Sequence, residues 1–293
     1  MATSSFGILR CAFGTIKGAV LALAAVGALT LALGASQAEA QANRGGYAPV
    51  DPFNSFSIGI GGGIDMFRTP VDVYAYDYFS NEVDFSDILK GRGGFGTVEI
   101  GKDFRFDRLV LGIYGEYNFG RKHDSTSDSN TEYNEGCSES ALAENCAMSE
   151  CVLYCNSEDT LTAQATLTLR DSYAVLARLG VLAGPQTLIY GLFGYTWQKY
   201  VADVSAYSTF YNDYDWYAPF SASKSGTIGG LTFGVGAEFM VNANVSVKGE
   251  YRFVKLGAVG NVGYCSEYPV CAEAHFGPTD DHVFRGVISF KLP

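Results

Sequence analysis

The sequence predicts an all-β fold, a closed antiparallel up-and-down barrel of eight transmembrane strands, from three observations. Segments in which apolar and polar residues alternate recur eight times along the chain. Short and long connections follow each other between these segments, as turns and loops do in transmembrane barrels. The face opposite the apolar one carries mainly Gly, Ser and Thr. Such a face suits a crowded barrel interior better than the charged, water-exposed face of a soluble sandwich, which is the alternative fold.

The composition agrees with a strand-rich membrane protein. The chain has 293 residues, of which 47% are hydrophobic and only 17% charged, with 35 glycines, 19 tyrosines and 20 phenylalanines. Disordered chains lack aromatic residues, and beyond the N-terminus no run approaches the ~18 consecutive apolar residues of a membrane-spanning helix. A net charge of −11 argues against a nucleic-acid partner.

The N-terminus has the three parts of a secretory signal peptide. Arg10 and Lys17 form a basic start, Gly18 to Ala35 is an uncharged apolar run, and Ala38-Glu39-Ala40 is a small-residue cleavage site. We therefore expect residues 1–40 to be removed by cleavage near Ala40, residues 41–52 to form a short periplasmic linker, and residues 53–293 to form the barrel. A retained anchor helix is the alternative interpretation of residues 18–35.

The first three predicted strands share one pattern. Ile60 and Ile64 alternate with glycines in the first strand, and Ile113 and Tyr117 alternate with polar or small residues in the third. Because side chains of a strand point alternately to its two faces, each segment has one apolar and one polar face. These strands are predicted at 53–67, about 93–104 and 109–119.

The fourth and fifth predicted strands are less regular. In the fourth, 161–181, one apolar face is predicted to run from Leu161 and Leu167 to Leu179 and Val181. The fifth, 187–201, alternates less clearly because both faces carry aromatic residues.

The last three predicted strands return to strict alternation. Phe233 and Val235 alternate with glycine in the sixth, and Val247 and Tyr251 alternate with charged residues in the seventh. Their ranges are 228–240, 245–256 and 282–292. Three connections are predicted to be short turns, at 105–108, 182–186 and 241–244, and four to be long polar loops, at 68–91, 120–160, 202–227 and 257–281.

Eight charged residues fall on the predicted inward faces, four of each sign. An unpaired buried charge costs several kcal/mol, so we expect these side chains to pair into a network. A polar plug that fixes the strand register is favoured over an ion path or gate, because open porin channels use 16–18 strands. The eight are Glu99, Glu116, Arg178, Glu238, Lys248, Glu250, Arg252 and Arg285.

Six cysteines follow the predicted cleavage site, and an even number in an exported chain predicts disulfides. Cys265 and Cys271 share the last long loop, so the simplest pairing joins them. The other four, in the 120–160 loop, allow three connectivities, and the sequence leaves all three open: Cys137, Cys146, Cys151 and Cys155. Metal binding is the alternative, but the spacing matches no strong zinc signature.

No catalytic residue, metal ligand or cofactor is predicted. A lipid-A-modifying hydrolase needs a serine and histidine with an orienting acid. His123 precedes Asp124 and Ser125, and His282 follows two aspartates, but neither lies in a recognised catalytic motif.

Several patches together resemble the small outer-membrane β-barrel proteins, the porin-like and opacity-type surface antigens related to the OmpA membrane domain. They are Gly93-Gly94-Phe95-Gly96, Val110 to Glu116, Ala177 to Gly180, Phe233 to Phe239, Ser246 to Gly257 and His282 to Phe290.

This resemblance implies an eight-stranded barrel in the cell outer membrane, with roles in envelope integrity and surface contact and no shared reaction. It implies outer-membrane lipids and lipopolysaccharide, the barrel-assembly machinery and an unknown extracellular ligand as partners. We therefore expect a non-enzymatic structural and surface-interaction protein, with long outer loops stapled by disulfides. A small-solute channel and a lipid-A-modifying enzyme are the alternatives.

Overall fold

The computed structural model describes residues 51–77, 81–134, 157–211, 216–264 and 270–292. Ten strands make up almost all of these residues, and no helix among them is long and apolar enough to cross a membrane. The strands are β1 Phe56–Asp77, β2 Glu82–Leu89, β3 Arg92–Phe106, β4 Leu109–Gly120, β5 Lys122–Asn134, β6 Ser157–Leu182, β7 Thr187–Tyr211, β8 Trp216–Met240, β9 Val245–Tyr264 and β10 Val270–Leu292.

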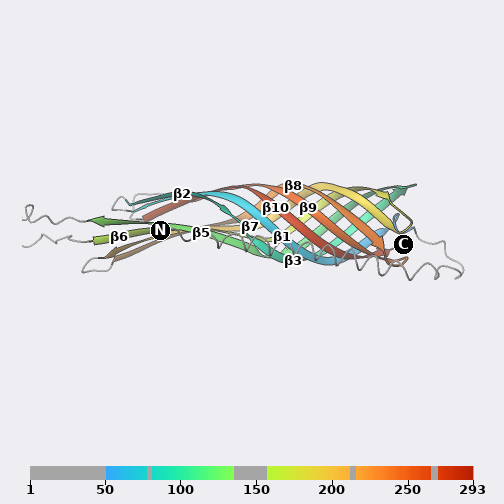
Figure 1. Ribbon diagram of the computed structural model, residues 1–293, viewed down its shortest axis with the longest axis horizontal. Coiled ribbons are helices and arrows are strands. Elements are labelled where there is room, and N and C mark those ends of the chain that lie inside the picture. Colours follow the sequence, from blue (N-terminus) through green and yellow to red (C-terminus); the bar gives the residue numbers. More distant parts are fainter. Residues whose placement is uncertain (1–50, 78–80, 135–156, 212–215, 265–269, 293) are drawn as a thin grey trace, which may run out of the picture.

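All strand pairs are antiparallel, and the pairing returns to its start. The order runs β1–β3–β4–β6–β7–β8–β9–β10, and β10 pairs with β1 from Phe56↔Leu292 to Asp77↔Val270, so the backbone hydrogen bonds form a ring. β2 pairs with β1 and β5 pairs with β6 outside this ring. Figure 1 shows the ring strands crossing obliquely at one end of the molecule and continuing as long ribbons at the other.

The number and length of the strands differ from the prediction. Eight strands were predicted, whereas the described residues form ten, because β2 and β5 lie inside the predicted loops 68–91 and 120–160. The loops predicted at 202–227 and 257–281 are also mostly strand, and β6, β7 and β8 reach 26, 25 and 25 residues. A tilted strand crosses a bilayer in about 9–11 residues, so each of these strands is long enough to continue well beyond it.

The half of the molecule that holds the short turns is apolar on the outside. We call it the membrane section: residues 56–66, 92–121, 171–198, 229–254 and 281–292. Ile60, Ile113 and Val235 are exposed on its outer surface at 55%, 55% and 61%. Many of the residues that alternate with them face inward and are small or charged, as in β1, where Gly59 lies between two isoleucines and Asp65 follows Ile64. This apolar outside with a polar inside is the pattern of a strand that faces lipid.

The other half has the opposite polarity. We call it the extension: residues 67–89, 122–134, 157–170, 199–211, 216–228, 255–264 and 270–280. Val71, Val73 and Ala75 of β1 are fully buried there, whereas Asp72 and Tyr74 between them are exposed. They join one apolar core with Leu161 to Leu169 of β6, Ala202 to Ala206 of β7 and Ala272 to Phe276 of β10.

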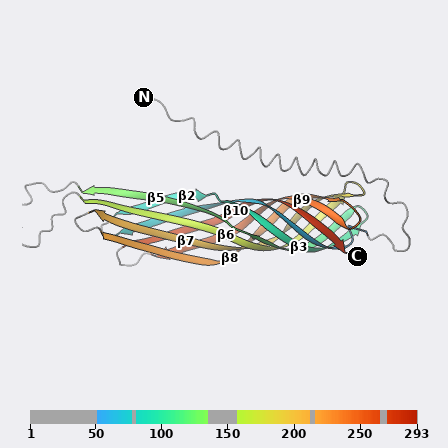
Figure 2. The same cartoon turned by 90° about the horizontal axis from the view of Figure 1, so that it is seen from below.

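The strands of the extension form two packed groups. β8 and β9 pair only as far as Gly230↔Leu256, and the described parts of β2 and β5 are not joined by backbone pairing. One group is therefore β2–β1–β10–β9 and the other β5–β6–β7–β8, with the apolar core between them. This is the arrangement of a soluble β-sandwich. Figure 2 shows the two groups extending beyond the crossing strands.

A β-bulge reverses the faces of β6. The pairing of β6 with β7 shifts between Leu169 and Ser172. Leu161 and Leu167 are buried inside the extension, whereas Leu179 and Val181 are exposed on the outside of the membrane section. The prediction of a single apolar face for 161–181 was therefore wrong, because an extra residue in a strand moves every later side chain to the other face.

The end of the molecule with the short turns is sealed by an apolar side chain. Phe53 precedes β1 and is fully buried among Val110, Leu182, Leu188 and Met240. Asp51 forms an ion pair with Arg105 at 3.2 Å, and this contact holds the segment against β3. Residues 1–50, with the predicted signal peptide and most of the predicted linker, lie outside the described residues.

Candidate functional site

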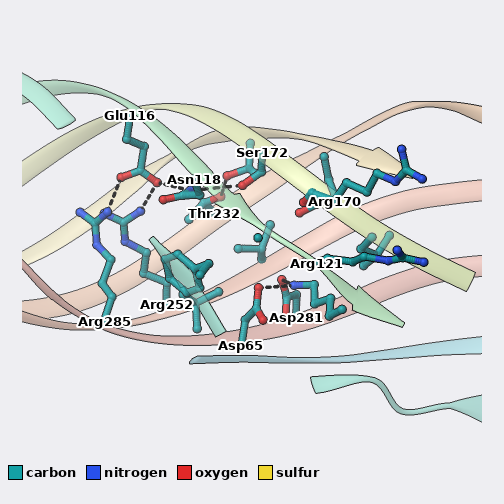
Figure 3. Close-up of a pocket in the computed structure, with 18 residues that line it drawn as sticks. Asp65, Glu116, Asn118, Arg121, Arg170, Ser172, Thr232, Arg252, Asp281 and Arg285 are labelled. Atoms are coloured by element: carbon teal, nitrogen blue, oxygen red, sulfur yellow. Dashed lines mark hydrogen bonds and ion pairs between the residues drawn. The ribbon is translucent and has the colours of Figure 1, made fainter. Parts of the chain in front are cut away.

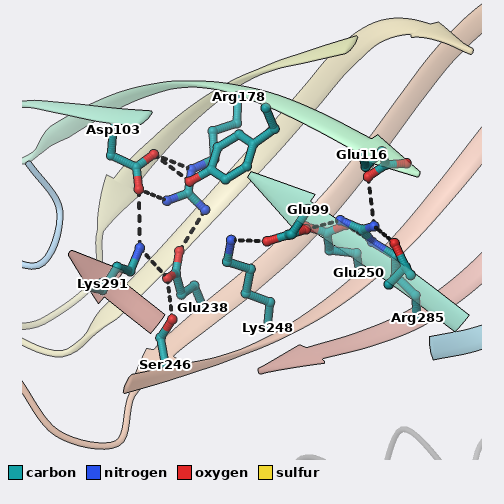
Figure 4. A network of polar contacts seen from close by, with 12 residues as sticks. Glu99, Asp103, Glu116, Arg178, Glu238, Ser246, Lys248, Glu250, Arg285 and Lys291 are labelled. Carbon is teal, nitrogen blue, oxygen red and sulfur yellow. Dashed lines mark hydrogen bonds and ion pairs between the residues drawn. The ribbon is translucent and has the colours of Figure 1, made fainter. Parts of the chain in front are cut away.

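Charged side chains fill the inside of the membrane section in two connected tiers (Figure 4). The tier beside Phe53 holds Asp103 of β3, Arg178 of β6, Glu238 of β8 and Lys291 of β10. Arg178 binds Asp103 through Nε and Nη2, at 2.9 and 2.6 Å, and Glu238 through Nη1 at 2.6 Å. Lys291 contacts the same two carboxylates, at 3.2 Å and 2.7 Å. All four side chains are at most 3% exposed.

The second tier is organised around Arg285 of β10. Its guanidinium contacts Glu99 at 2.7 Å, Glu116 at 2.7 Å and Glu250 at 2.6 Å. Arg252 bridges the latter two carboxylates from β9, at 2.5 Å and 2.7 Å. These contacts come from strands far apart in the sequence, so they tie opposite walls of the ring together.

Lys248 and the tyrosines Tyr114 and Tyr190 connect the tiers. Lys248 contacts Glu99 at 2.5 Å, and its Nζ lies 4.5 Å from the centre of the Tyr114 ring. The Tyr114 hydroxyl donates to Asp103, and the Tyr190 hydroxyl donates to Glu250. The guanidinium of Arg178 lies over both tyrosine rings.

The structure brings together all eight charged residues that the sequence placed on inward faces. Each side chain is at most 5% exposed and has at least one oppositely charged partner. Sequence reasoning missed Asp103 and Lys291. Both lie on the inward parity of their strands, two residues beyond Gly101 and Ser289, so extending the alternation to the strand ends would have found them.

A smaller charged group lies nearer the extension, beside a cavity of about 40 Å³ (Figure 3). Lys122 contacts Asp65 at 2.6 Å and Asp281 at 2.5 Å. One buried carboxylate oxygen of Asp281 has no hydrogen-bond partner among the described residues. A cavity of this size holds about two or three waters, so it offers that oxygen hydration.

In the two tiers, buried carboxylates and buried cations neutralise each other's charge. Five carboxylates face five cations, and each cation is in direct contact with a carboxylate. Buried charges need this pairing because each ion loses its hydration. Among the described residues no group of His, Cys, Asp and Glu has the arrangement of a metal site.

The three histidines lie away from this network. His282 is on the outer surface, where its Nδ1 lies 2.8 Å from the Tyr251 hydroxyl and its ring packs on Phe253. Asp281, next to it in sequence, points inward to Lys122. His123 and His275 are exposed in the extension, and His275 contacts Asn261.

The predicted disulfides fall mainly on residues that the structure does not describe. Cys137, Cys146, Cys151, Cys155 and Cys265 lie outside the described residues. Cys271 is 1% exposed and is not a free thiol. The pairing of Cys265 with Cys271 therefore stays a prediction.

Comparison with known proteins identifies the fold family. The outer membrane protein beta-barrel domain family matches residues 20–264, which is more than half of the chain. A search of curated proteins finds no match.

Three of the solved structures that match this chain are distant from it in sequence. Ail, the attachment invasion locus protein of Yersinia pestis, is 12% identical, with coverage of 76% of this chain and 98% of Ail and a TM-score of 0.24. OprG of Pseudomonas aeruginosa is 12% identical, with coverage of 80% and 96% and a TM-score of 0.32. The outer membrane protease OmpT of Escherichia coli is 8% identical, with coverage of 85% and 99% and a TM-score of 0.33. The predicted family and the predicted cell outer membrane location are confirmed. The chain belongs to the outer membrane protein beta-barrel domain family.

Proposed function

We propose that this chain is a non-enzymatic structural protein of the outer membrane, which holds a rigid β-sandwich above the lipid for contact with the surroundings. In this proposal the membrane section is a closed eight-stranded barrel, and β2 and β5 continue β3 and β4 into the extension. Outer-membrane lipids, lipopolysaccharide and the barrel-assembly machinery are its partners, together with an extracellular ligand of unknown identity.

The paired charge network carries this proposal. It occupies the lumen from Lys291 to Arg285, and Phe53 fills the mouth beside it. At the other mouth the apolar core of the extension lies over the Lys122 group. Side chains occupy most of the lumen, and a cavity of about 40 Å³ remains beside Lys122. This supports a structural role, because an eight-stranded barrel is just wide enough for side chains to fill.

The lengths of the turns support an orientation with the extension outside the cell. The connections after β3, β6 and β8 are short and lie at the same end as the paired strand ends Phe56 and Leu292. Short turns face the periplasm in this class of barrel. We propose that disulfides staple the outer connections, since these are exposed to proteases.

Conductance in planar lipid bilayers tests the structural role. The purified mature chain is expected to give no steady channel openings in salt solution. The double variant Glu99→Gln/Glu116→Gln tests whether the charged network is what blocks ion flow through the lumen. An open porin serves as the positive control. Steady openings of the parent protein would support the alternative, a small-solute channel.

A lipid-A-modifying activity is tested separately. The variants His282→Ala and His123→Ala, expressed at the level of the parent, are expected to leave the lipid A mass spectrum unchanged. A lipid A species that is present with the parent and lost with either variant would contradict the non-enzymatic proposal.

A further inference from the structure

Basic residues gather where the polarity of the strands reverses. On most ring strands the first outward-facing residue with a charge beyond the apolar outer surface is Arg or Lys. Examples are Arg68, which follows Met66 on β1, and Lys199, which follows Trp197 on β7. The set consists of Arg68, Arg92, Arg121, Lys199 and Lys255, together with Arg170, which lies next to Asp171 on β6, and all six are exposed.

Four of these residues, Arg68, Arg92, Arg121 and Arg170, lie on neighbouring strands, and we call them the arginine belt. Arg92 of β3 pairs with Met66, two residues before Arg68 of β1. Arg121 joins β4 to β5, and Arg170 lies in the bulge of β6, between the pairs Asn118↔Ser172 and Lys122↔Leu169. Figure 3 shows the Arg121 and Arg170 side chains extending away from Asp281 and Arg285, and both residues also line the cavity beside Lys122.

No described carboxylate forms an ion pair with the belt, although Asp280 stands opposite Arg68 in the β1–β10 pairing and Asp171 follows Arg170 on β6. Lys255 contacts Asp280 at 3.7 Å and Lys199 contacts Asp171 at 3.9 Å, whereas none of the four belt arginines has an ion pair within the described residues. In a chain with a net charge of −11, four neighbouring arginines without carboxylate partners mark a local excess of positive charge.

The surfaces on either side of the belt define what meets it. Toward the membrane section lie apolar and aromatic side chains, Met66, Phe119 and Tyr173, which are 39%, 52% and 40% exposed. Toward the extension lie acidic residues, among them Asp72 and Asp87, which are exposed. A ligand of the belt is therefore anionic, lies at the edge of the lipid and does not extend far over the extension.

We propose that the arginine belt binds the phosphate groups of a phosphorylated glycolipid in the outer leaflet, the lipid A class. A guanidinium forms two parallel hydrogen bonds to a phosphate, and cations at a membrane surface attract anionic headgroups. Four arginines spread over four strands suit a wide headgroup with more than one phosphate. Gly94, outward-facing beside Arg92, has no atom nearer than 3.8 Å to the position of a Cβ, so the headgroup can approach the strand there.

This inference rests on the proposed orientation, with the extension outside the cell. It is independent of whether the lumen conducts, because the belt lies on the outer surface. Bilayer conductance therefore tests the structural role, and lipid binding tests the belt, independently of each other.

Binding of purified lipids to the full mature chain in nanodiscs tests the belt. The variant Arg92→Gln/Arg121→Gln is compared with Arg105→Gln/Arg108→Gln, which removes two exposed arginines at the opposite end of the barrel. The probes are bis-phosphorylated lipid A, dephosphorylated lipid A and phosphatidylglycerol, and native mass spectrometry measures the lipid retained.

The belt variant is expected to bind bis-phosphorylated lipid A at least about tenfold more weakly than the parent, as the loss of one charge-assisted hydrogen bond predicts. The control variant and the parent are expected to bind bis-phosphorylated lipid A equally. Both are expected to bind dephosphorylated lipid A about as weakly as the belt variant binds bis-phosphorylated lipid A. Equal retention by the two double variants would overturn the inference, as would parent binding of phosphatidylglycerol that matches that of lipid A. Near-ultraviolet circular dichroism verifies that both variants are folded.

Discussion

The membrane section and the extension use the same strands in opposite ways. In β1, Ile60 and Ile64 point outward in the membrane section, the residues between them are glycines, and Asp65 after them contacts Lys122 inside. A few residues later Val71 and Val73 point inward, and Asp72 and Tyr74 point outward. The alternation of side chains is the same in both sections, so the difference lies in which face the surroundings require to be apolar.

This difference shows how one set of strands can be adapted to lipid at one end and to water at the other. Lipid demands an apolar outside and leaves the lumen to charges, which must then pair with each other. In water the outer surface can be charged, whereas apolar side chains are buried away from the solvent. The two groups of strands of the extension therefore pack against each other. Each of the following variants changes one face in one section.

The largest effect is expected inside the membrane section. Arg285→Leu removes the contact partner of Glu99, Glu116 and Glu250. Loss of one partner leaves buried carboxylates uncompensated, so the free energy of unfolding should fall by about 3–5 kcal/mol. Urea unfolding of the protein folded in lipid vesicles measures it.

Arg105→Leu is the control for that variant, because Arg105 pairs with Asp51 at the exposed surface. It should cost no more than about 1 kcal/mol. Equal losses for the two arginine variants would mean that the lumen is hydrated like the surface.

The second effect is expected inside the extension. Leu167 of β6 is fully buried in the apolar core, and Leu167→Ala should destabilise the extension by about 2–5 kcal/mol through the cavity that it leaves. Protection of β6 and β7 amides against hydrogen exchange should fall most in residues 157–170 and 199–211. Thr166→Ala, which changes the outward neighbour, should leave that protection unchanged; a similar loss for both would contradict the apolar core.

The third pair of variants compares the two outer surfaces. Ile60 and Tyr74 are both exposed on β1, at 55% and 38%. Ile60→Arg places a charge in lipid and should cost about 2–4 kcal/mol if position 60 lies near the middle of the bilayer. Tyr74→Arg places the same charge in water and should change stability by no more than about 0.5 kcal/mol. Unfolding in vesicles that gives the same value for both would place both residues in one solvent.

The smallest effect concerns the line of side-chain contacts between β2 and β5. The Thr126 hydroxyl donates to Asp87 at 2.6 Å, and this hydrogen bond lowers the pKa of Asp87 below its ordinary value of 3.8. Because the folded pKa lies below the unfolded one, the contact stabilises the fold above about pH 4 and is lost as the pH falls through the folded pKa. Exchange of β5 amides, corrected for its intrinsic pH dependence, should rise there slightly. Asp87→Asn should remove this pH dependence, and a variant that keeps it would assign the change to another group.

The sequence predicted the membrane section far better than the extension. Strict alternation located residues such as Ile60, Val235 and Glu250 on the correct faces, because a strand in lipid allows few exceptions. Most of the extension, apart from residues 161–170 of the fourth predicted strand, was predicted as loops, since its outward residues, such as Asp72 and Ser86, are as polar as those of a loop. The bulge at Leu169 and Ser172 was also missed, because one extra residue leaves no mark in composition.

The charge network was predictable in its members but not in its contacts. Parity placed Glu99 and Arg285 on inward faces, whereas their pairing depends on the register of β1 with β3 and β10, which the sequence does not specify. The arginine belt was not predicted at all. Arg92 lies just before the second predicted strand and Arg170 lies within the fourth, and only the structure shows that both of their strands pair with β4.

The central claim is that the surroundings of the strands change from lipid to water between Met66 and Asp72. A nitroxide label introduced singly at positions 60, 64, 68 and 72 of β1, with native cysteines replaced by serine, tests it directly in lipid vesicles. Paramagnetic relaxation by oxygen should dominate at 60 and 64, and relaxation by a water-soluble nickel chelate should dominate at 72, with the crossover near 68. Equal access of the nickel chelate at 60 and 72 would contradict the claim.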